Sequence, residues 1–243
     1  SGSRGVLICR NYSDFSKYKK MTFSETSNKE ILIEEFLSGP QISTESFVYK
    51  GKIITPGFID RNYDMLEKLK PRIIENGGNY PSEHYKKYHK KINLLIKKIA
   101  KSLHIYNGTI KGDIVIYKNE PYIIEVALRL SGGDLVETLI PLSTNFNLIA
   151  NAISLSLNNN ISNNKLKFKF KSTFIGHRYF FPKKGIVKKI SGVKEVKKYT
   201  WLKKISIFCK VGDKLTDPKD HTNRIGVFIL VGKNKKEIDK RIE

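Results

Sequence analysis

The pattern of hydrophobic and polar positions predicts a chain of mixed helices and strands. Apolar residues recur at helical spacing after Ser82, which predicts a long helix to about Leu103. Thr109–Tyr117 and Tyr122–Ala127 have strand character and are separated by Lys118–Pro121, a hairpin signal. Similar patterns predict helices at 13–20, 145–157, 193–198 and from 233, and strands at 29–37, 45–49, 53–60, 166–174, 205–210 and 225–231. Strands joined by tight turns and mixed with helices indicate an α+β fold.

Polar segments between these elements predict loops and a domain boundary. Lys50 and Gly51 separate two predicted strands as a hairpin turn, and residues 75–81 are rich in turn-forming types. The asparagine-rich stretch from Asn158 to Asn164 is the best candidate linker. We therefore expect one domain at 1–158 and a small C-terminal domain at 159–243.

The charge is strongly basic and unevenly distributed. The 243 residues include 45 Lys and Arg against 23 Asp and Glu, a net charge of +22. Residues 1–150 carry 22 basic and 16 acidic side chains, which leaves 23 and 7 for residues 151–243. A basic domain can bind nucleic acid, but Lys165, Lys167, Lys169 and Lys171 alternate with apolar residues, as in a strand with one solvated face. Because no nucleic-acid-binding motif is present, we do not expect such a partner.

Cysteine usage and hydropathy limit the protein class further. Cys9 and Cys209 are too few and too far apart for a disulfide framework or a zinc motif. No apolar run approaches the roughly 20 residues that span a bilayer. These features predict a soluble cytoplasmic protein without a membrane partner. The chain begins at Ser1 rather than Met, so we expect either a processed N-terminus or a piece of a longer chain.

The strongest chemical signal is a pair of carboxylates in the predicted hairpin. A turn at about Asn119 places Asp113 opposite Glu125, on the same face of the two strands. Two like charges in this position favour a cation between them, and Mg²⁺ accepts one or two carboxylates plus substrate phosphates. Alternatively, both carboxylates face solvent at a sheet edge. The apolar run around Glu125 favours the metal site.

Arg129 follows Glu125 by four positions and precedes Ser131, Gly132 and Gly133. Its guanidinium is suited to a phosphate or a substrate carboxylate, although it could also only neutralise Glu125. The adjacent glycines favour the first role, because they let the backbone approach a ligand closely.

Two further segments have the character of nucleotide-binding elements. Residues 1–5, Ser-Gly-Ser-Arg-Gly, are small residues whose backbone N–H groups suit an anion, although Ser-Gly-Ser could also be an expression remnant. In residues 33–41 an apolar run leads into paired acids and a turn.

Together these motifs resemble the ATP-grasp ligases in order and spacing, over about residues 1–157. The segment from Arg178 to Gly226 is similar to the small C-terminal domain of the L-amino-acid ligase branch. The resemblance implies an ATP-grasp fold, present in part, followed by a small α/β domain. It also implies ATP and Mg²⁺ (or Mn²⁺) as cofactors, small-molecule carboxylate and amine substrates, and a homodimer as a possible assembly.

The resemblance also implies a role for each motif. A loop over the β- and γ-phosphates would consist of Ser1, Gly2, Ser3, Arg4 and Gly5. The hinge at the adenine edge would be Glu34, Glu35, Phe36 and Leu37, with Gln41 at the ribose hydroxyls in place of the usual Glu. Asp113 and Glu125 would bind the metal, and Arg129 would hold the phosphoryl group. Substrate contacts would come from Arg61, Ser131, Gly132 and Gly133, with a structural salt bridge as the alternative role of Arg61. Ala127 stands where many members carry an Asn ligand for a second metal, which makes two-metal geometry doubtful.

The implied reaction is ATP-dependent formation of an amide or peptide bond through an acyl phosphate. Two alternatives stay open: another ATP-grasp enzyme, such as a biotin-carboxylase-like or purine-pathway ligase, and a non-catalytic basic module on an anionic polymer. The family pattern also has a lysine-bearing strand and an N-terminal domain upstream of the glycine-rich loop. Neither is in the chain, so we expect a fragment that binds MgATP weakly.

Overall fold

A computed structural model of the chain describes residues 2–26 and 30–243. The chain folds into two compact units. Unit 1 comprises residues 1–36, 62–77 and 177–230, and unit 2 comprises residues 37–61, 78–176 and 231–243. The boundary that the sequence predicts near residue 158 stays a prediction.

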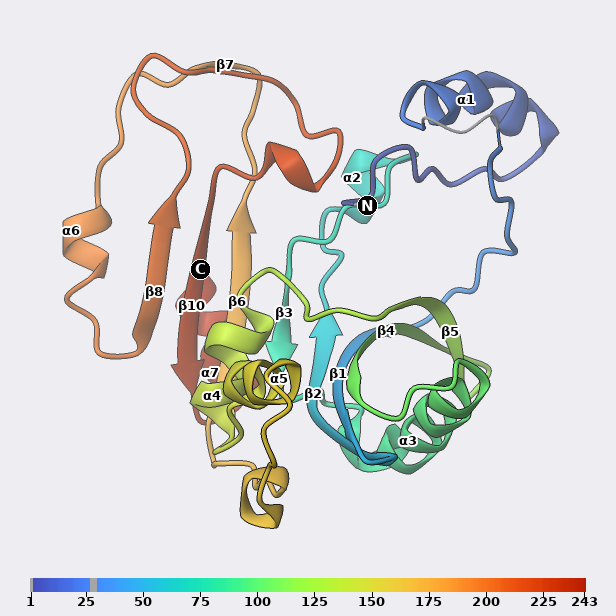
Figure 1. Cartoon of the computed structure of the whole chain (residues 1–243). Helices are drawn as coiled ribbons and strands as arrows, with labels where there is room; N and C mark the ends of the chain where they lie inside the picture. Colours follow the sequence, from blue (N-terminus) through green and yellow to red (C-terminus); the bar gives the residue numbers. More distant parts are fainter. Residues whose placement is uncertain (1, 27–29) are drawn as a thin grey trace. The chain divides into compact units, whose positions relative to one another are not determined.

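Unit 2 is built on antiparallel strands in the order β5-β4-β1-β2, with β3 paired to β2 (Figure 1). Their bounds are β1 Gln41–Tyr49, β2 Lys52–Arg61, β3 Gly77–Tyr80, β4 Gly108–Tyr117 and β5 Glu120–Ala127. The two predicted hairpins, β1–β2 and β4–β5, are confirmed. The loop predicted at 75–81 is wrong in part, because Gly78 and Asn79 pair with β2 as a short strand.

Helix α3, Tyr85–Ser102, covers one face of this sheet. Its buried side chains Tyr88, Ile92, Ile96 and Ala100 pack in one cluster with sheet residues. On β4 the isoleucines 110, 114 and 116 belong to this cluster, whereas Lys111 and Asp113 alternate with them. A period of two therefore places the polar residues of β4 on the face away from α3.

Short helices follow the β4–β5 hairpin in unit 2. Their bounds are η1 Leu135–Leu139, α4 Ile140–Ser143, α5 Leu148–Ser156, η2 Asn163–Leu166 and, at the end of the chain, α7 Lys235–Ile242. Phe146, between α4 and α5, makes an edge contact with Phe47 of β1, with ring centroids 6.5 Å apart. These helices thus contribute apolar contacts to the strands that carry the polar residues of unit 2.

The strand predicted at 166–174 is wrong over most of its length. Phe170 makes one isolated bridge to Thr144, and β6 begins only at Phe174. Phe168 and Phe170 instead contact each other edge to face, with centroids 5.4 Å apart, and Phe170 also packs on Tyr85. The aromatic side chains of this segment therefore pack on other rings, and most of the segment does not pair as a strand.

Unit 1 contains most of the strands β6, β10 and β8, which are neighbours in that order. Phe180 and Phe228 pack together between β6 and β10, with ring centroids 5.1 Å apart. The strands of unit 1 are β6 Phe174–Phe180, β7 Gly185–Ile186, β8 Leu202–Ile207, β9 Lys214–Leu215 and β10 Gly226–Gly232. Its helices are α1 Tyr12–Ser24, α2 Leu66–Leu69, α6 Val193–Val196 and η3 His221–Asn223.

The strand predicted at 29–37 is wrong for the described residues 30–37, which are irregular. Leu32 and Ile33 are 80% and 70% exposed, so this apolar run has little packing within the chain. Within residues 2–26 and 30–243, no helix is both long and apolar enough to cross a membrane. The α+β class is confirmed.

Candidate functional site

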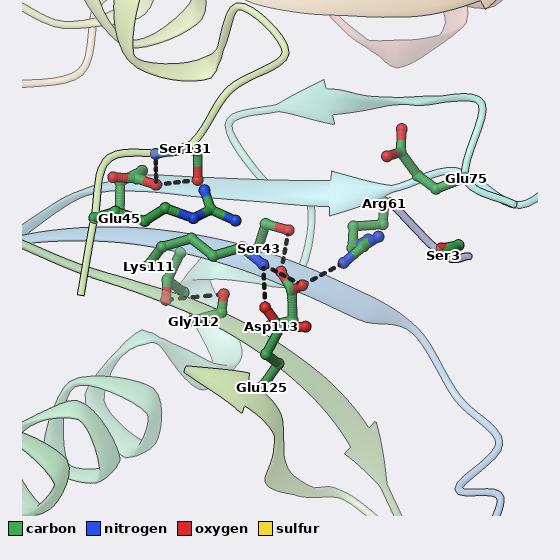
Figure 2. Close-up of polar contacts among 12 residues, drawn as sticks. Ser3, Ser43, Glu45, Arg61, Glu75, Lys111, Gly112, Asp113, Glu125 and Ser131 are labelled. Atoms are coloured by element: carbon green, nitrogen blue, oxygen red, sulfur yellow. Dashed lines mark hydrogen bonds and ion pairs between the residues drawn. The ribbon is translucent and has the colours of Figure 1, made fainter. Parts of the chain in front are cut away.

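The sheet face away from α3 carries two rows of polar side chains in unit 2. In the first row, Ser43 of β1 is opposite Asp113 of β4, which is opposite Glu125 of β5. In the second row, Glu45 is opposite Lys111, which is opposite Ala127. The predicted pairing of Asp113 with Glu125 is therefore confirmed, and Figure 2 shows both carboxylates beside Lys111.

Asp113 is the centre of the first row and is only 5% exposed. Its Oδ1 accepts a hydrogen bond from the Ser43 hydroxyl at 2.7 Å, and its Oδ2 lies 2.7 Å from Arg61 Nη1 and also contacts Lys111 Nζ. Burial raises the pKa of this carboxyl, but the Arg61 and Lys111 charges and hydrogen bonds from Lys111 and Ser43 outweigh it, so the pKa is lowered. Asp113 is therefore a carboxylate at neutral pH.

Glu125 differs from Asp113 in its surroundings. Its side chain is 59% exposed, and its Oε1 is 3.8 Å from Lys111 Nζ. The apolar run that contains Glu125 lies on β5, an edge strand on which Tyr122 and Ile123 are also exposed, so for Glu125 the solvent-facing alternative is confirmed. A ligand in solvent can therefore contact Glu125, whereas Asp113 is buried and contacts Ser43, Arg61 and Lys111.

The pair fits one hard divalent cation. Two carboxylates from opposed strand positions supply oxygen ligands, and Mg²⁺ commonly takes its remaining ligands from water and phosphate. Within the part of the chain that the structure describes, no group of three or more His, Cys, Asp and Glu side chains could hold a metal. Asp113 and Glu125 would thus supply two of the ligands of a metal held here, and its other ligands would be of another kind.

Glu45 is a buried carboxyl group that the sequence analysis missed. It is fully buried in the middle of β1, and its Oε1 accepts a 2.9 Å hydrogen bond from the Ser131 backbone N–H and another from the Ser131 hydroxyl. Its Oε2 has no hydrogen-bond partner among the described residues. Burial raises the pKa of Glu45 to about 7, against the lowering effect of the Ser131 hydrogen bonds and of the Lys111 and Arg129 charges.

A glycine on the neighbouring strand makes room for Glu45. Gly57 of β2 is opposite Glu45, and a Cβ at this position would lie 2.7 Å from the Cβ of Glu45. The register of β1 and β2 shifts between Glu45 and Phe47. Counting back from the Lys50–Gly51 turn would therefore have missed this pairing by one residue. Glu45 stands between Thr44 and Ser46 in a polar stretch of the sequence, so no local pattern marks it as buried.

Arg129 and the residues after it lead away from β5. Arg129 is exposed and donates a 3.1 Å hydrogen bond from Nη1 to the Leu130 carbonyl. A Cβ added to Gly132 would meet no atom within 4 Å, and Gly133 has a φ of +67°. This segment therefore presents backbone to open space, as the paired glycines indicated, and Ser131 is anchored to Glu45 rather than free.

The residues predicted to contact nucleotide are divided between the two units. Leu37 and Gln41 belong to unit 2, with Gln41 at the first position of β1, whereas Glu34, Glu35 and Phe36 are exposed irregular residues of unit 1. Gly2, Ser3, Arg4 and Gly5 form turns of unit 1, and Ser1 lies outside the described residues. The residues brought together in unit 2 are thus Arg61, Asp113, Glu125 and Ser131, with Lys111 and Glu45 added by the structure.

In unit 1, the turns at residues 2–5 contact the C-terminal segment. The Ser3 hydroxyl is 3.3 Å from Nε2 of His221, and the His221 backbone N–H donates to the Gly2 carbonyl at 3.0 Å. Arg224 donates to the Glu75 carboxylate at 3.0 Å and lies over the Tyr179 ring, 3.5 Å from its centroid. This cluster links the proposed phosphate loop to residues of the region that resembles the small C-terminal domain.

Comparison with known proteins gives matches to two family models and to several solved structures. The family model "ATP-grasp domain" matches residues 1–133, and the model "L-amino acid ligase C-terminal domain 2" matches residues 178–243. The L-amino acid ligase from Bacillus licheniformis is similar in structure, with a TM-score of 0.82 and 18% identity over 97% of this chain. The biotin carboxylase domain of 2-oxoglutarate carboxylase from Hydrogenobacter thermophilus, solved with MgADP, has a TM-score of 0.67 and 16% identity over 100% of the chain.

A curated relative is the large chain of carbamoyl phosphate synthase from Clostridium beijerinckii, 26% identical over 131 residues, or 54% of this chain. The chain spans 12% of that relative, 59% of the L-amino acid ligase and 53% of the biotin carboxylase domain. At these identities the solved structures establish the fold alone.

Proposed function

Because the chain belongs to the ATP-grasp family, we propose that it supplies the metal and phosphoryl-binding part of an ATP-dependent ligase that joins an amino-acid carboxylate to an amine. The observation that carries the proposal is the pair of opposed carboxylates, Asp113 and Glu125, with Arg61 and Lys111 around it. A buried, ionised Asp113 beside an exposed Glu125 suits a cation that must also reach a nucleotide phosphate.

The reaction proposed has two steps. The substrate carboxylate attacks the γ-phosphate of ATP, which gives an acyl phosphate and ADP, and the amine then displaces phosphate to form an amide. Mg²⁺ bound at Asp113 and Glu125 would supply charge neutralisation for the phosphates. The protein itself would position the reacting groups and supply positive charge near the phosphates, because such transfers need little acid–base chemistry from the protein.

Arg129 is the residue that we assign to the transferred group. Its guanidinium is exposed on the same segment as the open backbone at Gly132. Guanidinium groups bind phosphate and carboxylate oxygens in a bidentate manner, which suits both the acyl phosphate and the carboxylate that precedes it. Ser131, held by Glu45, would fix the start of this segment.

The match of residues 178–243 to the L-amino acid ligase C-terminal domain supports amino acids as substrates over bicarbonate or a phosphorylated amine. The fold alone does not distinguish them, because biotin carboxylase structures also match. Substrate class is therefore the part of the proposal that most needs a direct test.

The test is phosphate and ADP release from MgATP with pooled amino acids, measured on the chain together with any sequence that precedes Ser1 in its gene. We expect release that requires an amino acid and falls on the order of a hundredfold in Glu125→Gln. Glu120→Gln, which changes an exposed glutamate of the same strand, is the matched control and should keep the activity. Release with bicarbonate but with no amino acid would contradict the substrate class, and equal activity in Glu125→Gln would contradict the site.

A further inference from the structure

Lys111 occupies an unusual position for a lysine. It is opposite Ala127 on β5 and two residues before Asp113, so its side chain lies on the face that carries both carboxylates. Its Nζ contacts Asp113 Oδ2 and is 3.8 Å from Glu125 Oε1, and its side chain is only 12% exposed (Figure 2). The ammonium group thus bridges the two candidate metal ligands.

The surroundings of Lys111 explain why the ammonium stays there. Ala127, opposite Lys111 on β5, has a methyl side chain that cannot bind a metal. Glu45 is the residue of β1 opposite Lys111, and its carboxyl accepts a hydrogen bond from the Ser131 backbone N–H. Arg61 contacts the same Asp113 oxygen as Lys111. The formal charges of Arg61, Lys111, Asp113 and Glu125 cancel.

From this arrangement we infer that the Lys111 ammonium takes the place of one of two divalent cations, so that the protein binds a single metal ion with its nucleotide. The inference rests on the proposed function, since it concerns the metal of the same site. Two dications beside a buried ammonium would repel one another strongly at these distances. If Glu125 and Asp113 held one dication, the Lys111 ammonium beside them would supply the further positive charge that the nucleotide phosphates need.

The experiment counts metal ions rather than turnover. Free Mn²⁺ is measured by electron paramagnetic resonance during a titration of the protein, again with any sequence preceding Ser1, in saturating non-hydrolysable ATP analogue. We expect one Mn²⁺ for each bound nucleotide in the wild type. Two Mn²⁺ in the wild type would overturn the inference and leave the proposed function intact, whereas failure to bind the nucleotide would overturn the proposed function as well.

Variants test whether Lys111 itself is responsible. The double substitution Lys111→Ser with Ala127→Asn removes the ammonium and adds a ligand, and we expect two Mn²⁺ for each nucleotide. Lys97→Ser, at an exposed position of α3, is the control and should keep one. A double variant that keeps the wild-type circular dichroism spectrum but still binds one Mn²⁺ would overturn the inference. If the double variant does not fold, the wild-type count still decides between one metal and two.

Discussion

The buried carboxyl of Glu45 makes a quantitative prediction about stability and pH. Its folded-state pKa is about 7 against an ordinary value of 4.5, so the folded protein favours the protonated form more than the unfolded chain does. The contribution of this group to stability is therefore fully present below pH 4.5 and is lost as the pH rises through about 7. At about 1.4 kcal/mol for each pH unit of difference, the loss is on the order of 3 kcal/mol.

Glu45→Gln removes this dependence. The amide oxygen of glutamine can still accept the Ser131 hydrogen bonds, and the amide group cannot ionise. We expect the variant and the wild type to have similar free energies of unfolding near pH 4.5, and the variant to be more stable at pH 8 by on the order of 3 kcal/mol.

Urea unfolding followed by circular dichroism at pH 4.5, 6, 7 and 8 measures the difference. Glu120→Gln, at an exposed position, is the matched control and should change the free energy of unfolding by less than about 0.5 kcal/mol. A difference between Glu45→Gln and wild type that stays constant from pH 4.5 to pH 8 would refute the burial argument.

Four further substitutions test the packing around the site, each by the free energy of unfolding in urea. Gly57→Ala should lose about 1–3 kcal/mol, because its Cβ would lie 2.7 Å from that of Glu45, whereas Gly132→Ala has open space and should be nearly neutral; equal effects would contradict the geometry. Asp113→Asn should lose about 3–5 kcal/mol at pH 7 by leaving two cations without their anion, and a loss below about 1 kcal/mol would show that the cluster is solvated. Ile92→Ala, at a fully buried position of α3, should lose about 2–5 kcal/mol, and a smaller loss would mean that α3 does not cover this face.

The β4–β5 hairpin and the pairing within it could be predicted from the sequence. The period-two pattern on β4 and the turn signal at Lys118–Asn119 are local features, and counting away from the turn gives the pairs from Tyr117–Glu120 to Ile114–Ile123. The register shifts by one residue between Ile114 and Asp113, on the turn side of Asp113, so a count from the observed Tyr117–Glu120 pair would give Ile124 as the partner of Asp113. The pairing with Glu125 was reached because the turn was placed at Asn119 itself, which matches the register beyond the shift.

Other parts of the site depend on contacts that no local pattern reveals. The pairing of Glu45 with Gly57 follows a register shift in β1, and a one-residue shift cannot be counted from a turn. The bridging position of Lys111 depends on three strands together. The exposure of Glu125 could not be decided from the sequence, because an apolar run on an edge strand has the same pattern as a buried one.

The errors in the fold have a similar origin. Residues 30–37 have the composition of a strand but pair with no strand among the described residues, so composition alone was misleading. Residues 166–174 alternate like a strand, yet Phe168 and Phe170 satisfy their apolar character by ring contacts. In both segments, partners distant in sequence decide whether a strand-like pattern becomes a strand.

The most direct test of the central proposal follows an oxygen atom. If a substrate carboxylate attacks the γ-phosphate of ATP, one carboxylate oxygen leaves with the phosphate when the amine displaces it. Incubation of the protein, with any sequence preceding Ser1, with MgATP and ¹⁸O-carboxylate amino acids should therefore release phosphate that carries one ¹⁸O atom, as measured by mass spectrometry. Phosphate released in an amino-acid-dependent reaction without ¹⁸O would contradict the acyl phosphate and with it the proposed ligase chemistry.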